Sequence, residues 1–209
     1  MSIRLFDLFF GFLLFLLFLP FLLIIALCIK VSDLKSPVFV DKHLRVGKGG
    51  NLFRMYKFRT MKPGSHDMML KDPGLIKKKR EGRGKISMKD DPRVTSMGKI
   101  IRKLDLDESP QIFNVLKGDM SLIGPRPYLK EEVDEYKETY DIFNKRIDDV
   151  LKIKPGMTGL WQISGRNLLN PGKRVECDYE YFKKRGLLFN LLILLKTPYV
   201  VLTRYGAKD

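Results

Sequence analysis

The chain has 209 residues, with 39 Lys and Arg against 24 Asp and Glu, and a net charge of +15. So basic a chain indicates anionic partners: lipid head groups, phosphorylated substrates or nucleic acid. The two cysteines, Cys28 and Cys177, offer neither a disulfide framework nor zinc-site spacing, and two isolated histidines argue against a histidine metal site or a Ser-His triad.

An uncharged run of 22 residues, Leu8 to Ile29, lies near the start of the chain. At about 1.5 Å per residue, it is long enough to cross a hydrocarbon layer of ~30 Å. A secretory signal peptide has a shorter apolar core of ~7–15 residues and a small-residue cleavage site, which Lys30-Val31-Ser32 does not provide. A spanning helix and a re-entrant hairpin both stay open, because Pro20 can break a helix but also occurs in ordinary spanning helices.

The distribution of charge predicts the side of the membrane. Only Arg4 and Lys30 of the 39 basic residues lie at or before residue 30, which leaves 37 in the rest of the chain. Basic segments stay preferentially in the cytoplasm, where the leaflet is anionic. We therefore predict a membrane anchor over residues 1–30 and a cytoplasmic domain over residues 31–209, large enough to bury a core.

The first part of this domain is predicted to be extended. Val38–Val40 reads as a short strand, and Gly47–Gly50 separates Leu44–Val46 from the apolar-rich segment Leu52–Arg59. Two such runs around a glycine-rich turn predict a small β-hairpin. The glycines could instead cradle a phosphate, but no helix follows them as in a P-loop.

Charged loops and two short helices are expected next. Residues 62–95 are predicted to be rich in loops, with Lys77–Arg80 either solvated or on anionic lipid. A short helix is expected over Ser96–Lys103. Ser109-Pro110 predicts an N-cap followed by proline at the first position of another helix, which Gly118 ends.

Pro127 begins the longest helix predicted in the domain, with one apolar stripe at spacings of three and four residues. The stripe consists of Leu129, Val133, Tyr136, Tyr140, Phe143, Ile147 and Val150. It predicts packing on the core in preference to a coiled-coil partner. Farther on we expect a short strand at Leu160–Ile163 and an amphipathic helix carrying Val175, Tyr179 and Phe182. An interfacial or buried helix, too short to span a bilayer, is expected over Gly186–Leu195.

The segment from Leu104 to Pro127 has the residues best suited to chemistry. Asp107 and Glu108 form an acid pair directly before the Ser109-Pro110 helix start. The N–H groups and dipole of a helix start favour an ionised carboxylate, as a nucleophile or a Mg²⁺ ligand requires. Acidic residues also cap helices commonly, so the pair alone is a weak signal.

Two arginines strengthen the interpretation of the acid pair. Arg102 lies five residues before Asp107, and Arg126 stands between Pro125 and Pro127, which restrict the backbone on both sides. A guanidinium on a stiff segment suits phosphate oxygens. The acid pair, the arginines and the anchor together predict metal-assisted phosphoryl transfer beside a bilayer.

The chain resembles the bacterial sugar transferases, the monotopic polyprenol-phosphate phosphoglycosyl transferases. The resemblance covers nearly the whole sequence and rests on several long motifs in order. They are the apolar segment with its proline, Arg45 to Met61, Asp91 to Lys103, the acid-pair segment through Pro127, and Lys154 to Arg166. Leu19 departs from the serine usual before the proline, and Ser109 departs from a usually apolar position.

The resemblance implies an α+β, mainly helical fold with a re-entrant membrane helix broken at Pro20, a small β-hairpin and amphipathic interfacial helices. It implies transfer of a sugar-1-phosphate from a UDP-sugar to undecaprenyl (polyprenol) phosphate at the inner leaflet of the bacterial cytoplasmic membrane, in a glycan, capsule or exopolysaccharide pathway. Asp107 would be the nucleophile, forming an aspartyl-phosphosugar intermediate and releasing UMP. Glu108 would help to bind Mg²⁺, together with Asp107, or take a proton from the lipid phosphate. Arg102 and Arg126 would hold phosphates.

Two other functions compete with this one. A membrane-tethered basic module that binds anionic lipid or nucleic acid explains the anchor and the charge, but it does not explain an acid pair flanked by arginines. A phosphotransferase that uses a cytidine-linked lipid donor is the second rival. We expect no nucleic-acid partner, and the sequence leaves the sugar and the oligomeric state open.

Overall fold

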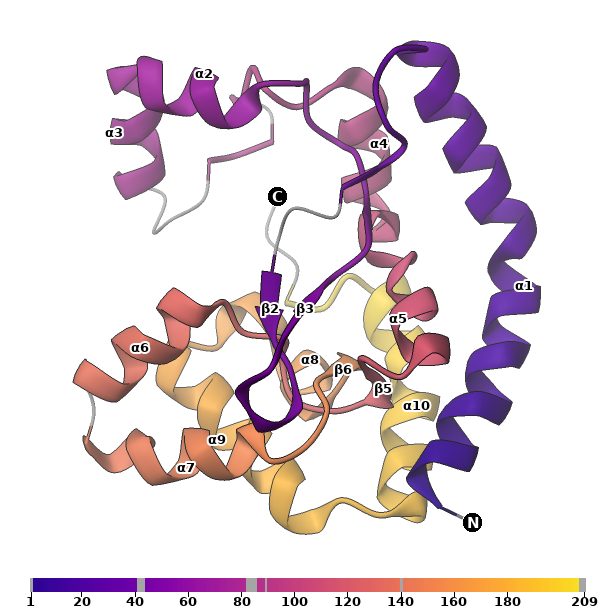
Figure 1. Ribbon diagram of the computed structural model, residues 1–209, viewed down its shortest axis with the longest axis vertical. Helices are drawn as coiled ribbons and strands as arrows, with labels where there is room; N and C mark the ends of the chain where they lie inside the picture. The colour runs from indigo at the N-terminus through magenta and orange to yellow at the C-terminus, as the bar shows by residue number, and fades with distance from the viewer. Residues whose placement is uncertain (1, 41–43, 82–85, 89, 140, 207–209) are drawn as a thin grey trace. The chain divides into compact units, whose positions relative to one another are not determined.

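The computed structural model describes residues 2–40, 44–81, 86–88, 90–139 and 141–206. The described chain is mainly helical, and its strands are only two or three residues long (Figure 1). This confirms the predicted α+β, mainly helical class.

The chain divides into two compact units. The first unit contains Met1–Leu19, Asp41–Tyr56 and Gln111–Lys208. The second unit contains Pro20–Val40 and Lys57–Pro110. Both units therefore include parts of the domain predicted over residues 31–209, and the division into anchor and cytoplasmic domain at residue 30 stays a prediction.

The apolar run forms helix α1, Ile3–Ser32, with Pro20 inside it. By length and composition, α1 is the one helix among the described residues that could cross a membrane. A break at Pro20 was predicted, but the helix continues through this residue. A proline removes one backbone hydrogen bond without always terminating a helix. The boundary between the two units falls at Leu19 and Pro20, and the re-entrant course stays a prediction.

The start of α1 is fixed to the rest of the first unit by two charged side chains. Arg4 donates to the carbonyl oxygens of Val115 and Leu116, at 2.6 and 2.7 Å. The buried Asp7 accepts hydrogen bonds from the Ser121 hydroxyl at 2.8 Å and the Leu122 N–H at 2.9 Å. Arg4 thus satisfies carbonyls at the end of helix α5, Gln111–Lys117.

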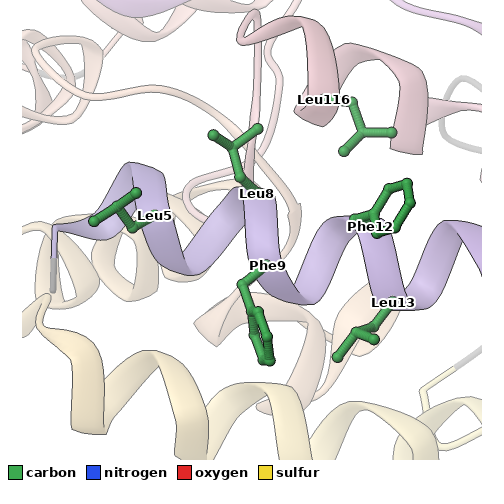
Figure 2. Close-up of a pocket in the computed structure, with 6 residues that line it drawn as sticks. All are labelled: Leu5, Leu8, Phe9, Phe12, Leu13 and Leu116. Carbon is green, nitrogen blue, oxygen red and sulfur yellow. The ribbon is translucent and has the colours of Figure 1, made fainter.

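Beside these polar contacts, α1 presents an apolar hollow together with α5. Figure 2 shows the side chains of α1 and that of Leu116, which projects from α5 toward α1. The residues lining the hollow are Leu5, Leu8, Phe9, Phe12, Leu13 and Leu116. Large exposed apolar side chains on α1 are what a helix in contact with lipid requires.

The predicted hairpin is present in the first unit. Strands β2, Leu44–Val46, and β3, Leu52–Arg54, pair antiparallel, with Arg45 opposite Phe53. The connecting turn includes the short 3-10 helix η1, Lys48–Gly50, in which Gly49 has a φ of 71°. That angle favours glycine, so the glycines serve the turn.

A parallel strand pair contacts α5. Strands β5, Ser121–Ile123, and β6, Gly156–Thr158, pair in parallel. The main chains of Gly124 and Gly156 approach so closely that a Cβ on Gly156 would lie 2.1 Å from the Gly124 nitrogen. Gly156 is therefore required by close packing of the backbone.

Two helices replace the single long helix predicted after Pro127. They are α6, Lys130–Thr139, and α7, Asp141–Leu151, which contact one another. Much of the predicted stripe is nevertheless buried, in a core formed by Val46, Tyr128, Val133, Tyr136, Ile147, Val150 and Val175. Tyr140 and the Phe143 side chain lie outside the described residues. Apolar spacing predicted the buried face correctly, but it does not detect a break between two helices that share one core.

From Leu160 onward, the described part of the first unit consists mainly of helices joined by short turns. Helix α8, Leu160–Ile163, stands where a strand was predicted, and this prediction is wrong. The 3-10 helix η3, Arg166–Leu168, comes next. The two predicted helices that follow are confirmed as α9, Pro171–Lys184, and α10, Leu187–Leu202.

The second unit combines a two-stranded pairing with short helices. Strand β1, Phe39–Val40, pairs antiparallel with β4, Lys57–Phe58. Helices α2, Ser65–Lys71, and α3, Pro73–Glu81, occupy much of the segment predicted as loops, and Lys77–Arg80 lies within α3. The predicted helix over Ser96–Lys103 is confirmed as α4, and Thr95 caps it through the Gly98 N–H.

Candidate active site

The acid pair lies on a 3-10 turn of the second unit. Asp107 and Glu108 belong to η2, Leu106–Glu108, which follows α4. Asp105, directly before the turn, has a φ of 55°, a left-handed conformation that is uncommon for a residue other than glycine. The main chain is therefore turned sharply just before the two carboxylates.

The predicted N-cap at Ser109 is not formed. The Ser109 hydroxyl donates to the Leu106 carbonyl at 2.7 Å, within the same turn as the acid pair, and α5 begins at Gln111. A short polar side chain can bond to a neighbouring carbonyl as readily as to a helix N–H. Ser109 thus stabilises the turn that presents the acid pair.

A lysine that the sequence analysis did not select contacts this pair. Lys57, on β4, donates to Glu108 Oε1. Burial raises the pKa of Asp107, the Glu108 carboxylate raises it further, and Lys57 and Arg102 partly oppose these effects. The direction is opposite to that expected at a helix N-terminus, because burial outweighs the effect of the helix start. The signal that could have identified Lys57 is its position in a run of alternating aromatic and basic residues, Tyr56 to Arg59.

Arg102 is held in place near the acid pair by the second unit. Its Nε donates to Thr60 Oγ1 at 2.8 Å. The Thr60 carbonyl in turn accepts the Thr95 N–H at 3.0 Å, at the start of α4. A Cβ on Gly98 would lie only 2.1 Å from that carbonyl oxygen, so α4 rests directly on the Thr60 backbone. The second unit thus brings Asp107, Glu108, Arg102 and Lys57 into one polar cluster, which we call the acid-pair cluster.

Arg126 belongs to the first unit, where it has its own set of contacts. Its Nη2 donates to Glu132 Oε1 at 3.0 Å, and its guanidinium carbon lies 5.6 Å from the centre of the Trp161 ring. Its main-chain N–H donates to Asp178 Oδ2 at 3.1 Å. These contacts therefore restrain Arg126 in addition to the two flanking prolines from which its rigidity was predicted.

Asp178 is a buried carboxylate that the sequence analysis also missed. Besides the Arg126 N–H, its Oδ2 accepts the Tyr128 hydroxyl at 2.6 Å. Burial raises the pKa of Asp178 to about 7, although the two hydrogen bonds and nearby arginines oppose the change. The sequence does contain a signal for it, because Asp178 falls three residues after Val175 on the apolar face of its helix.

Comparison with known proteins settles the family. The description "Bacterial sugar transferase" is that of the family whose profile matches residues 1–204. The chain belongs to the bacterial sugar transferase family. This confirms the family inferred from the sequence motifs.

Relatives of this bacterial sugar transferase include proteins of different lengths. It is 44% identical over 189 residues to the undecaprenyl-phosphate galactose phosphotransferase of Salmonella typhimurium, covering 88% of this chain and 37% of that protein. It is 36% identical over 209 residues to the exopolysaccharide production protein ExoY of Sinorhizobium fredii, covering 98% and 87%. The uncharacterized sugar transferase EpsL of Bacillus subtilis is 37% identical over 208 residues, covering 99% and 90%. The transferase thus spans little more than a third of the Salmonella protein and most of the other two.

The oxygen ligands of the acid-pair cluster suit a magnesium ion. Among the described residues, no group of three or more His, Cys, Asp and Glu could hold a metal. Magnesium in phosphoryl-transfer sites, however, is commonly bound by one or two carboxylates, with water and substrate phosphates completing its octahedron. Asp107 and Glu108 of the transferase supply this number and type of ligand.

Proposed function

We propose that this bacterial sugar transferase moves a sugar-1-phosphate from a UDP-sugar to undecaprenyl phosphate, at the inner leaflet of the cytoplasmic membrane. The observation that carries the proposal is the acid-pair cluster, in which two adjacent carboxylates on one 3-10 turn are flanked by Lys57 and Arg102. The name of the Salmonella relative supports the lipid acceptor, and that of ExoY supports a place in exopolysaccharide production.

The first half-reaction uses Asp107 as the nucleophile. A carboxylate oxygen of Asp107 attacks the phosphorus that bears the sugar, and the bond from that phosphorus to the bridging oxygen of UMP breaks. UMP leaves with the bond's electrons, and the sugar phosphate stays on Asp107 as an acyl phosphate. Partial burial of Asp107 removes water that would otherwise solvate the nucleophile or hydrolyse the intermediate.

The second half-reaction transfers the sugar phosphate to the lipid. An oxygen of undecaprenyl phosphate attacks the same phosphorus, and Asp107 leaves as a free carboxylate. Glu108 accepts the proton if the lipid phosphate arrives as the monoanion. Asp107 reacts first with the UDP-sugar, and its intermediate then reacts with the lipid phosphate. The kinetics should therefore be ping-pong.

The basic residues reduce the repulsion among these anions. Arg102, fixed by Thr60, and Arg126, fixed by Glu132 and Asp178, offer planar donors suited to phosphate oxygens. Lys57 offers a compact charge beside Glu108. A magnesium ion held by Asp107 and Glu108 would supply further positive charge to the transferring phosphate.

Membrane attachment follows from the lipid acceptor. Undecaprenyl phosphate has its head group at the bilayer surface, so the enzyme must work there. The apolar helix α1 supplies an anchor by length and composition. Mainly basic residues after it favour the cytoplasmic side.

The test is a burst experiment without the lipid acceptor. Full-length enzyme with a panel of UDP-sugars and Mg²⁺ should release about one UMP per enzyme, and mass spectrometry should place a phosphosugar adduct on Asp107. Asp107→Asn should abolish both signals while the protein stays folded and membrane-bound. Asp67→Asn, the same exchange at an exposed site on α2, is the matched control.

Other outcomes distinguish the rivals. An adduct on another residue, or ternary-complex kinetics with no adduct, would remove Asp107 as the nucleophile. A binding module would give no turnover with any donor, and its binding of lipid would be insensitive to Asp107→Asn. Release of CMP from a cytidine-linked lipid would identify the other phosphotransferase.

A further inference from the structure

A second arginine shares the indole ring on which Arg126 rests. The guanidinium carbon of Arg174 lies 5.4 Å from the centre of the Trp161 ring, and that of Arg126 lies 5.6 Å from the same centre. Trp161 is only 9% exposed, so its ring is a fixed platform for both groups. All three residues belong to the first unit.

Arg174 has no carboxylate partner among the residues that the structure describes. Its Nε donates a hydrogen bond to the Leu169 carbonyl at 3.2 Å. It lies in the first turn of α9, which contains no acidic residue and where the helix dipole disfavours a cation. Burial lowers the pKa of Arg174, and the nearby Arg126 lowers it further. The position is therefore electrostatically unfavourable for an arginine without a ligand.

Glu132 and Asp178 are the two carboxylates in contact with Arg126. Glu132 is 3.0 Å from Arg126 and 4.0 Å from Arg45, so one carboxylate serves two guanidinium groups. Asp178 is buried, and that burial raises its pKa and so disfavours its charged form.

We propose that Arg126 and Arg174 together form a phosphate-binding site on the Trp161 platform. Two guanidinium groups beside one ring can share the oxygens of a single phosphate or diphosphate, each through a planar pair of donors. A bound phosphate would relieve the repulsion between the arginines and would also be favoured by the first turn of α9. The proposal rests on the proposed function for the source of that phosphate, either the nucleotide donor or the lipid acceptor.

Trp161 makes the site directly observable, because it is the one tryptophan of the sequence. The test titrates the full chain in detergent micelles with inorganic pyrophosphate, following Trp161 fluorescence and, in parallel, the heat of binding by calorimetry. The titration is made on the Asp107→Asn variant, so that no turnover is required. Saturable binding is expected, and Arg174→Gln should raise the Kd at least tenfold. Lys173→Gln is the matched control, since it removes a charge from the same turn without touching the ring, and should change the Kd less than twofold.

Two results would overturn the proposal. One is a pyrophosphate Kd unchanged by Arg174→Gln, and the other is no binding to the parent protein by either method. Circular dichroism shows whether Arg174→Gln folds; if it does not, Arg174→Lys replaces it. That variant keeps the charge but loses the planar donors, so a Kd raised at least threefold supports the site and an unchanged Kd contradicts it.

Further titrations identify the source of the phosphate. Weaker binding of UDP in Arg174→Gln, with farnesyl phosphate unaffected, would assign the site to the donor, and the reverse would assign it to the acceptor. These results are independent of the burst experiment. Loss of pyrophosphate binding in Arg174→Gln would support the site even if the parent enzyme released no UMP.

Discussion

Arg126 has defined partners for both its side chain and its main chain. Glu132 bonds its guanidinium, Asp178 bonds its main chain, and prolines flank it on both sides. These contacts fix the orientation of the Arg126 guanidinium plane. A fixed orientation favours a ligand that accepts two parallel hydrogen bonds from the guanidinium.

We predict that Arg126→Ala lowers the rate of UMP release by about ten- to a hundredfold, because one charged hydrogen-bonded contact contributes about 1.5–3 kcal/mol. Arg126→Lys should also be poor, since an ammonium cannot reproduce the fork. The measurement is steady-state UMP release, with membrane association followed by sedimentation. Arg185→Lys, at an exposed site over Phe182, is the matched exchange and should be neutral. Full activity of Arg126→Lys would contradict the argument from the fork.

Asp178 should make stability depend on pH. Its native pKa of about 7 is above the ordinary value of 3.8, so between these values the native state holds a proton that the unfolded chain has lost. The contribution of Asp178 to the free energy of unfolding should therefore fall as pH rises from about 4 to about 7. Asp178→Asn does not titrate, and the difference in stability between wild type and variant should shrink, or change sign, across this window. Urea unfolding at about pH 5 and about pH 8 measures it, and a difference independent of pH would show that Asp178 titrates normally.

The sequence indicated the acidic and arginine members of the candidate site but not the residues that position them. Asp107, Glu108 and Arg102 could be selected because unusual residue types stand close together in the chain. Thr60 and Asp178 could not, since Thr60 lies 42 residues from Arg102 and Asp178 lies 52 from Arg126. Contacts over such separations depend on tertiary packing, which residue spacing does not specify.

At the scale of elements, sequence patterns that lie within one helix predicted the structure better than a pattern that runs through two helices. The sequence predicted helices α4 and α9, and the structure adds their caps at Thr95 and Asn170. The strand predicted over Leu160–Ile163 is a helix, because a mainly apolar run of four residues does not distinguish a strand from a helix. Likewise, α6 and α7 place their apolar residues in one core, so one stripe runs through two helices.

The attachment of α1 to β5 is the element contact most open to measurement. Asp7→Ala would leave the buried Ser121 hydroxyl and the Leu122 N–H without their acceptor. We predict a loss of about 1–3 kcal/mol in the free energy of unfolding for each donor left unsatisfied. Thermal unfolding in detergent micelles should show a lowered Tm, with Asp7→Asn, which keeps one acceptor oxygen, intermediate.

A double-mutant cycle separates this hydrogen bond from other effects of the substitution. Ser121→Ala in the Asp7→Ala background removes the orphaned hydroxyl, so the two changes together should cost less than the sum of each alone. Strictly additive changes would mean that the bond between Asp7 and Ser121 contributes no stability.

At the scale of the whole molecule, composition and structure agree on a protein that works at a membrane. Helix α1 exposes large apolar side chains along its length, and α10 exposes others, such as Leu188 and Leu202. The basic residues follow the anchor almost without exception. The amino-acid sequence was sufficient for this conclusion because it depends on totals of apolar and charged residues and not on particular contacts.

The course of α1 through the membrane remains the prediction with the widest consequences. The helix is continuous through Pro20, yet the boundary between the two compact units falls at that proline. We predict that the N-terminus and the catalytic part lie on the same, cytoplasmic side, with Pro20 at the turning point of a re-entrant path. Lys30 would then lie at the inner surface, its stem along the lipid and its ammonium in water.

Accessibility of a cysteine near Ser2 decides between the two paths. The cysteine is introduced in a background lacking Cys28 and Cys177, and intact cells are treated with a reagent that does not cross the membrane. A re-entrant anchor leaves the cysteine unlabelled until the cells are opened, whereas strong labelling of intact cells would establish a spanning helix. Pro20→Ala is the informative comparison, because restoring the missing backbone donor favours a straight helix. If Pro20 directs the path, labelling from outside should rise in this variant and stay low in Leu19→Ala, which alters the neighbouring side chain without adding a donor.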